Sequence, residues 1–482
     1  MSSQNPTNSS HIFEKHKVST LLVKFSLPAI LSLLVSEMYN MVDSIFVGNA
    51  VGTLGMGALT VAFPVQRLFI SLALMVAMGT STYVARSYGE KDVEKVNHII
   101  SNSFLLLFVI IAGTALFIGL NLKKTIYFLG SSTTIFPYAK TYIGIVLWGV
   151  FFQAFTSLCS HIMVVLGRPR VLLTSMLIGS ICNVIIDYVL VILIPLGVQG
   201  AAIATISSQF IAAVYTFIVF TKAAKKENIH ISKKLDFFIA KSILAIGFSN
   251  FIVEVSDAVV AVILNQLLST YGGDTAIAIV GIISRSTMVL FMTVIGVSTG
   301  MQPIAAYNFG AQNFIRLKKV LREATIGVTA STFVLWGGAM VFAQPIARAF
   351  VKDPIVIAEA TKALRIVILI FPVLGVHYLN IYYYQAIGKV RSAFLLSIYR
   401  QIIIFIPLVF LLTFQFELWG AWIAYPISDL IAFVTSVVLM IKAYKEVSKE
   451  AHVQYLQEKE QKKLTPKTKT KNQSWVLREN EI

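Results

Sequence analysis

Two polar side chains interrupt one of the long apolar runs of this sequence. Asn183 and Asp187 lie within the stretch NVIIDYVL, inside an apolar run from about residue 171 to residue 195. Because they are four residues apart, they project from the same face of a helix. A buried carboxylate needs a charged partner, an ion or a hydrogen-bond donor. These two residues are therefore the first candidates for chemistry.

Three further polar residues are expected to join this pair. The stretch YNMVD supplies Asn40 and Asp43, and Thr205 lies five residues after the short turn PLGVQG. Oxygen ligands of this kind suit Na⁺, and two neighbouring carboxylates equally suit a proton, because the proton removes the repulsion between them. The alternative is structural, since the same groups could simply hydrogen-bond to neighbouring helices.

The elements that carry these residues are expected to be membrane-spanning helices. Of 482 residues, 56% are hydrophobic and only 13% are charged, whereas soluble proteins carry about 25% charged residues. Apolar runs of about 20 residues, enough to cross ~30 Å of hydrocarbon, recur along nearly the whole chain. We expect an all-α polytopic membrane protein whose twelve transmembrane helices are centred near residues 34, 70, 109, 150, 182, 211, 253, 290, 331, 371, 403 and 431.

The basic residues predict the orientation of these helices. The net charge is +17, and Lys and Arg gather in alternate connections, as in Lys91 and Lys95 after the second span and Arg168 and Arg170 after the fourth. The positive-inside rule then places both termini in the cytoplasm. The charge therefore needs no nucleic acid to explain it. We expect a monomer in the plasma or inner cell membrane, with the lipid bilayer and small molecules as its partners.

The chain repeats itself at an offset of 221 residues. MGTSTYVARSYGEKD resembles TGMQPIAAYNFGAQN, so that Gly79 matches Gly300 and Gly89 matches Gly310, and LGRPR matches IGKVR at the same offset. We interpret these glycines as components of tight turns. The repeat predicts two six-helix lobes in the same orientation, related by an axis along the membrane normal. The expected divisions are an N-terminal segment (1–20), an N-terminal lobe (21–222), a basic linker (223–237), a C-terminal lobe (238–444) and a charged, solvated tail (445–482).

The second half offers candidates for the cleft between the lobes, where a transported molecule would lie. Glu254 and Asp257 are one turn apart in the seventh span and could attract a cationic compound, partner each other, or pair with Arg285. Aromatic and thioether side chains could hold a flat lipophilic cation by stacking, although such residues also fill any helix interface. The residues concerned are Met288, Phe291, Met292, Tyr378, Tyr382 and Gln385.

A few other reactive side chains inside the spans have competing interpretations. Arg67 in the second span has Glu37 as its expected counterion. His377 could relay a proton or pack through a hydrogen bond. Cys159 and Cys182 are expected to be free thiols that pack as small hydrophobic groups, because neither the location nor the number of cysteines favours a disulfide or a metal site.

These residues together resemble the multidrug and toxic compound extrusion (MATE) transporters, and more closely their DinF-like branch. The resemblance covers about residues 21 to 445 and rests on VKFSLPAILSLL, YNMVDSIFVG, NVIIDYVL with GVQGAAIAT, and PIAAYNFGA, in this order. It implies efflux of organic, often cationic, drugs by antiport with H⁺ or Na⁺ through alternating access, without another cofactor. The cation-site positions of the family fall on Asp43, Asn183, Asp187 and Thr205, and all four residue types match.

The resemblance implies less for the C-terminal half. Glu254 stands where the NorM-like branch carries a cation-binding glutamate, but an aspartate of that branch's tenth helix has no counterpart in GVHYLNIYYYQAIG. At an offset of 221, apolar residues replace both Asn183 and Asp187. A role equivalent to theirs is therefore left to Glu254 and Asp257, and a second cation site is not expected.

Two other classes of function fit less well. A lipid-linked precursor flippase of the same superfamily would share the two lobes, but it should have two extra helices and a cleft lined with Arg and Lys for pyrophosphate. A membrane-bound enzyme would need a catalytic cluster, and the sequence contains no HExxH, no GxSxG, no P-loop and no metal-spaced cysteines. We therefore expect a transporter that is driven by an ion gradient and is not an enzyme.

Overall fold

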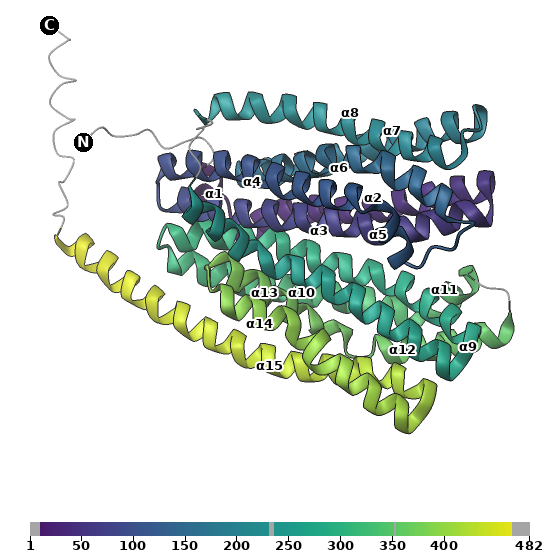
Figure 1. Cartoon of the computed structure of the whole chain (residues 1–482). Coiled ribbons are helices and arrows are strands. Elements are labelled where there is room, and N and C mark those ends of the chain that lie inside the picture. The colour runs from purple at the N-terminus through teal and green to yellow at the C-terminus, as the bar shows by residue number, and fades with distance from the viewer. Residues whose placement is uncertain (1–9, 231–235, 351–352, 465–482) are drawn as a thin grey trace, which may run out of the picture.

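The computed structural model describes residues 10–230, 236–350 and 353–464, which form helices and short turns without a strand (Figure 1). The helices lie roughly along one common direction in two groups, one formed by each half of the chain. The first half comprises α1 (Ser10–Lys15), α2 (Val18–Val51), α3 (Thr53–Gly89), α4 (Val93–Leu120), α5 (Leu122–Phe128), α6 (Phe136–Val165), α7 (Arg170–Asp187), the π-helix η1 (Tyr188–Leu193) and α8 (Gly197–Lys226).

The second half begins with the longest helix of the structure, α9, which holds two apolar spans, at Phe237–Leu268 and Ile279–Gly310. Its elements are α9 (Phe237–Gly310), α10 (Phe314–Val341), α11 (Ala343–Phe350), α12 (Pro354–Val367), α13 (Phe371–Ala386), α14 (Val390–Ile398), the π-helix η2 (Tyr399–Phe405) and α15 (Ile406–Leu464).

The described helices account for the twelve predicted spans. Ten segments are long and apolar enough to cross a membrane, and an eleventh arises when α12 and α13, which are bent by 50° relative to each other, count as one span. The segment from Val390 to Glu460 contains a twelfth, because the backbone at Glu417 is non-helical (φ 50°, ψ −131°) and divides it. The twelve-helix fold predicted from hydropathy is confirmed.

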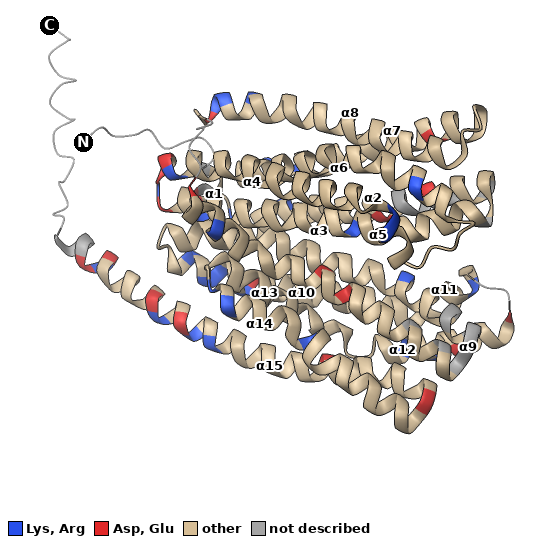
Figure 2. Cartoon of the chain, viewed as in Figure 1, with Lys and Arg blue, Asp and Glu red and all other residues tan. Residues whose placement is uncertain are grey.

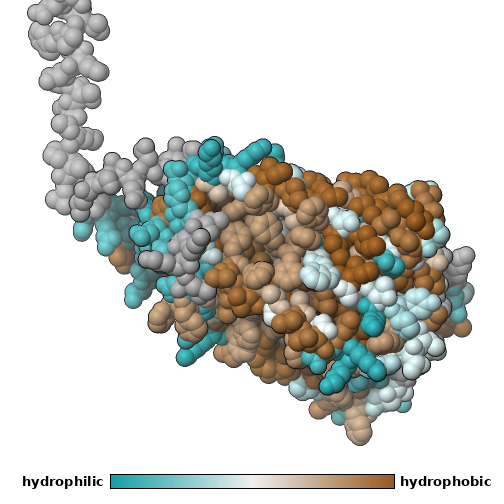
Figure 3. Space-filling view, turned by 45° about the horizontal axis from the view of Figure 1, so that its top comes forward, coloured by the Kyte–Doolittle hydropathy of each residue, from teal (hydrophilic) through white to brown (hydrophobic). Residues whose placement is uncertain are grey.

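The surface of the bundle matches an environment of lipid between two polar ends. Exposed apolar side chains such as Phe117, Trp148 and Phe217 cover the flanks, and the view in Figure 3 shows a broad hydrophobic face, with hydrophilic residues concentrated at one end and fewer at the other. Figure 2 shows most Lys and Arg at that end, where α1, the C-terminal end of α8 and the C-terminal part of α15 lie. We call it the basic end.

The two lobes touch through glycines near the basic end. A Cβ atom on Gly247 of α9 would lie 1.8 Å from the carbonyl oxygen of Met75 on α3, and a Cβ atom on Gly79 would lie 2.1 Å from the carbonyl oxygen of Ile243. Contacts this short leave room for hydrogen alone, so the helices of the two lobes pack backbone to backbone. Small residues permit the same close approach in membrane helices generally.

Another pair of these contacts lies on the pseudo-twofold axis of the molecule. A Cβ atom on Gly89 would lie 2.1 Å from the carbonyl oxygen of Tyr307, and a Cβ atom on Gly310 would lie 2.0 Å from the carbonyl oxygen of Arg86. The offset of 221 residues relates Gly89 to Gly310, and it also relates Arg86 to Tyr307. The two contacts are therefore copies of each other, and the pseudo-twofold axis passes between them.

The interpretation of the repeated glycines as turn residues is correct for only some of them. Gly167 and Gly388 do occupy turns, with φ values of 75° and 77°. Gly79 and its counterpart Gly300 instead lie inside α3 and α9, and Gly89 and Gly310 are the last residues of these helices. Glycine is needed at these positions because the opposite lobe comes too close for a larger side chain, and not because of the local backbone conformation.

The short helix α1 contacts both lobes at the basic end. Phe13 is buried and stacks on Tyr307 with ring centroids 4.9 Å apart, and the Tyr307 hydroxyl donates a hydrogen bond to Oε1 of Glu14 at 2.8 Å. On the other side, the Ile12 side chain covers Gly167 of the N-terminal lobe. The helix thus bridges the lobes beside the contact between Gly89 and Gly310.

The charged tail departs from the expectation of a wholly solvated extension. Helix α15 continues to Leu464, and Val447 and Ala451 are buried. The side-chain oxygen of Gln454 accepts hydrogen bonds from the first backbone N–H groups of α10, at Phe314 and Ile315. The beginning of the tail therefore caps α10 instead of projecting freely.

The lobe contact yields a first prediction. Because a methyl group on Gly247 would meet backbone atoms that cannot rotate away, we expect Gly247→Ala to destabilise the purified protein by about 1–3 kcal/mol, seen as a lower thermal midpoint. Gly113→Ala is the matched control, because its Cβ would meet nothing within 4 Å and alanine favours a helix over glycine. Equal midpoints for the two variants would contradict the contact.

Candidate functional site

The structure buries four of the five predicted polar residues between helices of the N-terminal lobe. Asp43 of α2 is 7% exposed, and Asn183 and Asp187 of α7 and Thr205 of α8 are fully buried. The carboxyl groups of Asp43 and Asp187 are close enough to interact, and Asn183 lies beside Asp187. The fifth residue, Asn40, belongs to α2, and its side chain lies outside the described part of the structure.

The backbone around this pocket explains how Thr205 approaches it. Helix α7 ends at Asp187, where the π-helix η1 begins, and such wide turns are frequent at functional sites. A Cβ atom on Gly200 would lie 2.7 Å from the carbonyl oxygen of Leu190, so α8 packs directly on η1. Thr205 and Asp187 are five and three residues from this contact, which places them within about one helical turn of the same depth.

Most polar atoms of the pocket have no hydrogen-bond partner outside the pocket among the described residues. This holds for Oδ1 of Asp43, both carboxylate oxygens of Asp187, Oδ1 and Nδ2 of Asn183 and Oγ1 of Thr205. Two adjacent carboxylates are both acceptors, so they can share a hydrogen bond only if one carries a proton. Buried polar atoms normally have partners. The arrangement is therefore suited to bind a proton or a small cation.

A second group of charges bridges the two lobes. Arg67 of α3 lies between Glu37 of α2 and Glu254 of α9, with Nη2 of Arg67 3.0 Å from Oε1 of Glu37 and Nη1 3.9 Å from Oε2 of Glu254. The predicted pair of Glu37 and Arg67 is confirmed. The basic partner of Glu254 is thus Arg67 of the opposite lobe and not Arg285, which the sequence had suggested.

Accessible space reaches this group, although the lobes are closed at the basic end. The side chains of Arg67 and Glu254 are each 33% exposed, and Asp257, one turn beyond Glu254, is also exposed. Arg67 stands 12 residues before Gly79 on α3, about 18 Å along the helix. These partly exposed charges therefore lie well away from the glycine contacts near the basic end.

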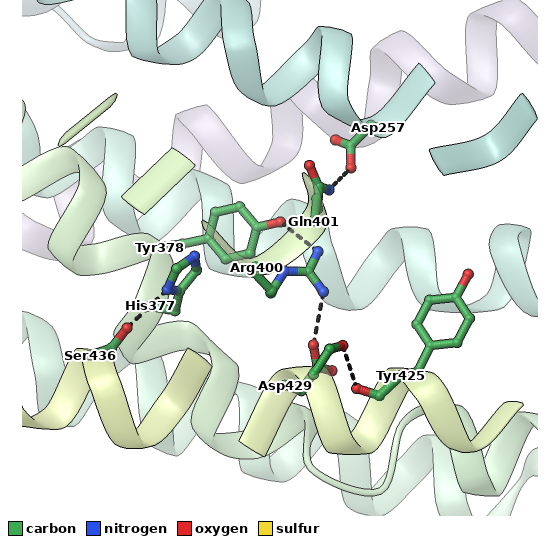
Figure 4. A network of polar contacts seen from close by, with 9 residues as sticks. Asp257, His377, Tyr378, Arg400, Gln401, Tyr425, Asp429 and Ser436 are labelled. Atoms are coloured by element: carbon green, nitrogen blue, oxygen red, sulfur yellow. Dashed lines mark hydrogen bonds and ion pairs between the residues drawn. The ribbon is translucent and has the colours of Figure 1, made fainter. Parts of the chain in front are cut away.

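The C-terminal lobe contains a buried polar network around Arg400 of η2 (Figure 4). Nη1 of Arg400 lies 2.8 Å from Oδ1 of Asp429 on α15, and Nη2 donates to the hydroxyl of Tyr378 on α13 at 3.1 Å. The next residue, Gln401, donates its amide to Asp257 of α9. The guanidinium also lies 5.7 Å from the ring centroid of Phe291. An internal cation therefore occupies the polar centre of this lobe.

The pair of Arg400 and Asp429 was missed by the sequence interpretation, which named Glu254 and Asp257 as the acids available to this half. That statement was wrong, because Asp429 is a third acid and is buried at 3% side-chain exposure. The signal was present in YRQIII and ISDLIAF, which place an arginine and an aspartate inside apolar runs. The same criterion that selected Asp187 would have selected both residues.

The predicted cavity-lining residues of this lobe mostly pack its interior in this conformation. Phe291 meets Phe371 and Tyr378 edge to face, and Oε1 of Gln385 accepts hydrogen bonds from Asn250 and Gln302. The side chains that are buried are Met292, Tyr378, Tyr382 and Gln385, and those that are partly exposed are Met288 and Phe291. Their packing role agrees with the alternative interpretation given above.

The remaining reactive side chains are structural. His377 is buried, and its Nδ1 lies 2.9 Å from Oγ of Ser436, which is the helix-packing interpretation of this histidine. Cys159 and Cys182 are free thiols, as predicted.

Comparison with known proteins connects this geometry to a family. The MatE family model matches residues 28–189 and 245–411, with one match in each lobe. The multidrug export protein MepA of Staphylococcus haemolyticus is 26% identical over 412 residues, which cover 85% of this chain and 90% of that protein. MepA of Staphylococcus aureus is 26% identical over 417 residues, with the same coverage.

Solved structures show the same fold over nearly the whole chain. An outward-facing multidrug resistance MATE family transporter superposes with a TM-score of 0.86 at 21% identity and covers 92% of this chain and 100% of that one. A MATE structure in a bent conformation superposes with a TM-score of 0.87 at 21% identity, covering 93% and 100%. The two matched lobes and the shared fold lead to one conclusion: this chain belongs to the MatE family of multidrug and toxic compound extrusion transporters.

Proposed function

We propose that this protein exports organic, often cationic, compounds by antiport with H⁺ or Na⁺ through alternating access. The observation that carries the proposal is the pair of carboxylates of Asp43 and Asp187, which are buried without hydrogen-bond partners at the oxygens described above. Intramembrane acids of this kind mark ion pathways. The relatives named multidrug export proteins support the class of substrate.

The pocket offers ligands for either coupling ion. Two carboxylates, one amide oxygen and one hydroxyl are hard oxygen donors that suit Na⁺. A single proton shared by Asp43 and Asp187 would equally remove their repulsion. In both cases the ion neutralises charge that would otherwise remain buried. Its binding and release therefore change the free energy of the contact between α2, which carries Asp43, and α7, which carries Asp187.

Helix α2 connects this pocket to the contact between the lobes. It carries Asp43 near one end, and toward the other it carries Ile30 and Ser26, which lie against Gly296 and Gly300 of α9. A shift of α2 that accompanies ion binding therefore moves residues that close the basic end. This is a physical route by which an ion gradient drives alternating access.

The basic end is the cytoplasmic end in this proposal, because Lys and Arg concentrate on the cytoplasmic side of membrane proteins. Both termini are then cytoplasmic, and the lobes are packed together on that side. In this proposal, the accessible space beside Arg67 and Glu254 faces the outside, as expected for an outward-facing state of a monomer in the cell membrane.

Orientation can be tested with cysteines placed in a background that lacks Cys159 and Cys182. We expect an impermeant maleimide to label Ser132→Cys, in the turn before α6, in intact cells. Lys226→Cys, at the end of α8, should react only after the cells are opened. Both positions are exposed, so unequal labelling reports sidedness. Labelling of Lys226→Cys in intact cells would refute the cytoplasmic assignment.

The coupling role of the pocket predicts the behaviour of Asp187→Asn. In ATP-free liposomes with an imposed pH or Na⁺ gradient, we expect wild-type protein to move ethidium and Asp187→Asn to lose this activity while folding normally, because the amide removes the charge that responds to the ion. Asp92→Asn is the control, because Asp92 caps α4 and asparagine also serves as an N-cap. Wild-type transport by Asp187→Asn would overturn the assignment, and comparison of the two gradients identifies the ion.

The proposal also predicts unequal roles for the two lobes. The polar centre of the C-terminal lobe already holds Arg400, so it needs no external cation. We expect Asp43→Asn to abolish gradient-driven transport, whereas Glu254→Gln should retain part of it with a changed apparent affinity for the dye, because this exposed acid attracts cations. Initial rates at matched protein density decide the point. Equal and complete loss in both variants would indicate two coupled cation sites.

A further inference from the structure

The guanidinium of Arg67 divides its two terminal nitrogens between carboxylates of different lobes. Its Nη2 atom makes a hydrogen bond of 3.0 Å to Glu37 of the same lobe, whereas its Nη1 atom lies 3.9 Å from Glu254 of the opposite lobe. A guanidinium can make two short parallel bonds to one carboxylate. Here the bond within the lobe is tight, and the contact across the lobes is loose.

Arg67 is held by two side chains of its own lobe, an aromatic ring and a carboxylate. Its guanidinium carbon lies 4.9 Å from the ring centroid of Phe63, one turn earlier on α3, and Glu37 holds it from α2. Both contacts remain if the guanidinium leaves Glu254. The contact with Glu254 is therefore the one that can be exchanged without leaving the arginine charge unpaired.

The surroundings of Glu254 favour a second cation. Glu37 and Asp257 lie within electrostatic reach of Glu254, together with Arg67. Arg400, which is within electrostatic reach of Asp257, pairs with Asp429, so four carboxylates share two guanidinium groups. The side chain of Glu254 is 33% exposed, so a molecule in the accessible space between the lobes can reach it.

We propose that Arg67 is a tethered cation that competes with the cationic group of the exported compound for Glu254. This inference rests on the proposed export of organic cations. Without the compound, Arg67 partly neutralises Glu254; when an ammonium or iminium group arrives, Arg67 withdraws onto Glu37 and Phe63. Arg67 is thus a specificity-determining residue, because a compound gains from Glu254 only if its charge replaces that of the arginine.

The competition predicts opposite effects for the two residues that flank it. Removing the competitor in Arg67→Gln should tighten binding of a cationic dye. Removing the residue that restrains the competitor, in Glu37→Gln, should weaken binding, because Arg67 then pairs fully with Glu254. A purely structural role for the group would weaken binding in both variants. The paired substitutions therefore separate the two explanations.

The experiment measures ethidium binding to the purified protein in nanodiscs by fluorescence anisotropy. For partly exposed ion pairs we expect a change in Kd of about twofold to tenfold, downward for Arg67→Gln and upward for Glu37→Gln. The double variant Glu37→Gln/Arg67→Gln should bind as tightly as Arg67→Gln alone. In a Glu254→Gln background, the effect of Arg67→Gln should disappear, because the group for which it competes is absent.

The outcomes keep this inference distinct from the proposed function. Equal or weaker binding by Arg67→Gln, or shifts of Arg67→Gln and Glu37→Gln in the same direction, would overturn the competition. Arg67→Met, whose chain keeps an apolar contact with Phe63, serves in the same measurement if Arg67→Gln does not fold. Wild-type protein that neither binds ethidium nor exports it along a gradient would instead refute the proposed function itself.

Discussion

A carboxylate surrounded by helices and lipid must find a partner, and this requirement shapes each charged part of the molecule. In the C-terminal lobe the partner is part of the chain, because Arg400 lies between Asp429 and Tyr378. Between the lobes, Arg67 serves two acids at once. In the N-terminal lobe, the described residues supply no partner for either oxygen of Asp187. The cost of an unpaired buried charge is thus met by protein in one lobe, and in the proposed mechanism it is met by the coupling ion in the other.

The contrast between the lobes explains how a repeated architecture can perform an asymmetric task. Both lobes carry a π-helix beside their polar centre, η1 after Asp187 and η2 around Arg400, and both use wide turns to bring polar groups inward. The guanidinium of Arg400 is held in place by Asp429 and Tyr378, so this polar centre carries its own cation. In the proposed mechanism, the other lobe changes its charge whenever its ion binds or leaves, and α2 carries that change to the glycine contacts near the basic end.

The sequence predicted the features that lipid imposes directly. Hydropathy located all twelve spans because an apolar run of sufficient length has few alternatives to a membrane helix. Helical spacing placed Asn183 beside Asp187 for a similarly local reason. The sequence did not predict that Arg67 reaches Glu254 across the lobes, nor that Gly89 lies against Tyr307, because those contacts depend on the three-dimensional arrangement of helices far apart in the chain. The role of Gly79 was misassigned for the same reason: a glycine in a turn and a glycine at a helix contact look alike in sequence.

The contact between Gly89 and Gly310 has a consequence for how the two halves of a duplicated gene can diverge. Because the pseudo-twofold axis passes between them, each glycine packs against the other half of the chain. A larger residue at either position would therefore obstruct the contact for both halves. Polar centres away from the axis are surrounded by their own lobe, so each half can alter its centre independently. The chain bears the mark of this difference: at the same offset of 221, glycine is matched at the axis, whereas Asn183 and Asp187 are replaced by Ile404 and Leu408. The glycines at the contact have thus stayed alike in the two copies, whereas the polar centres have diverged.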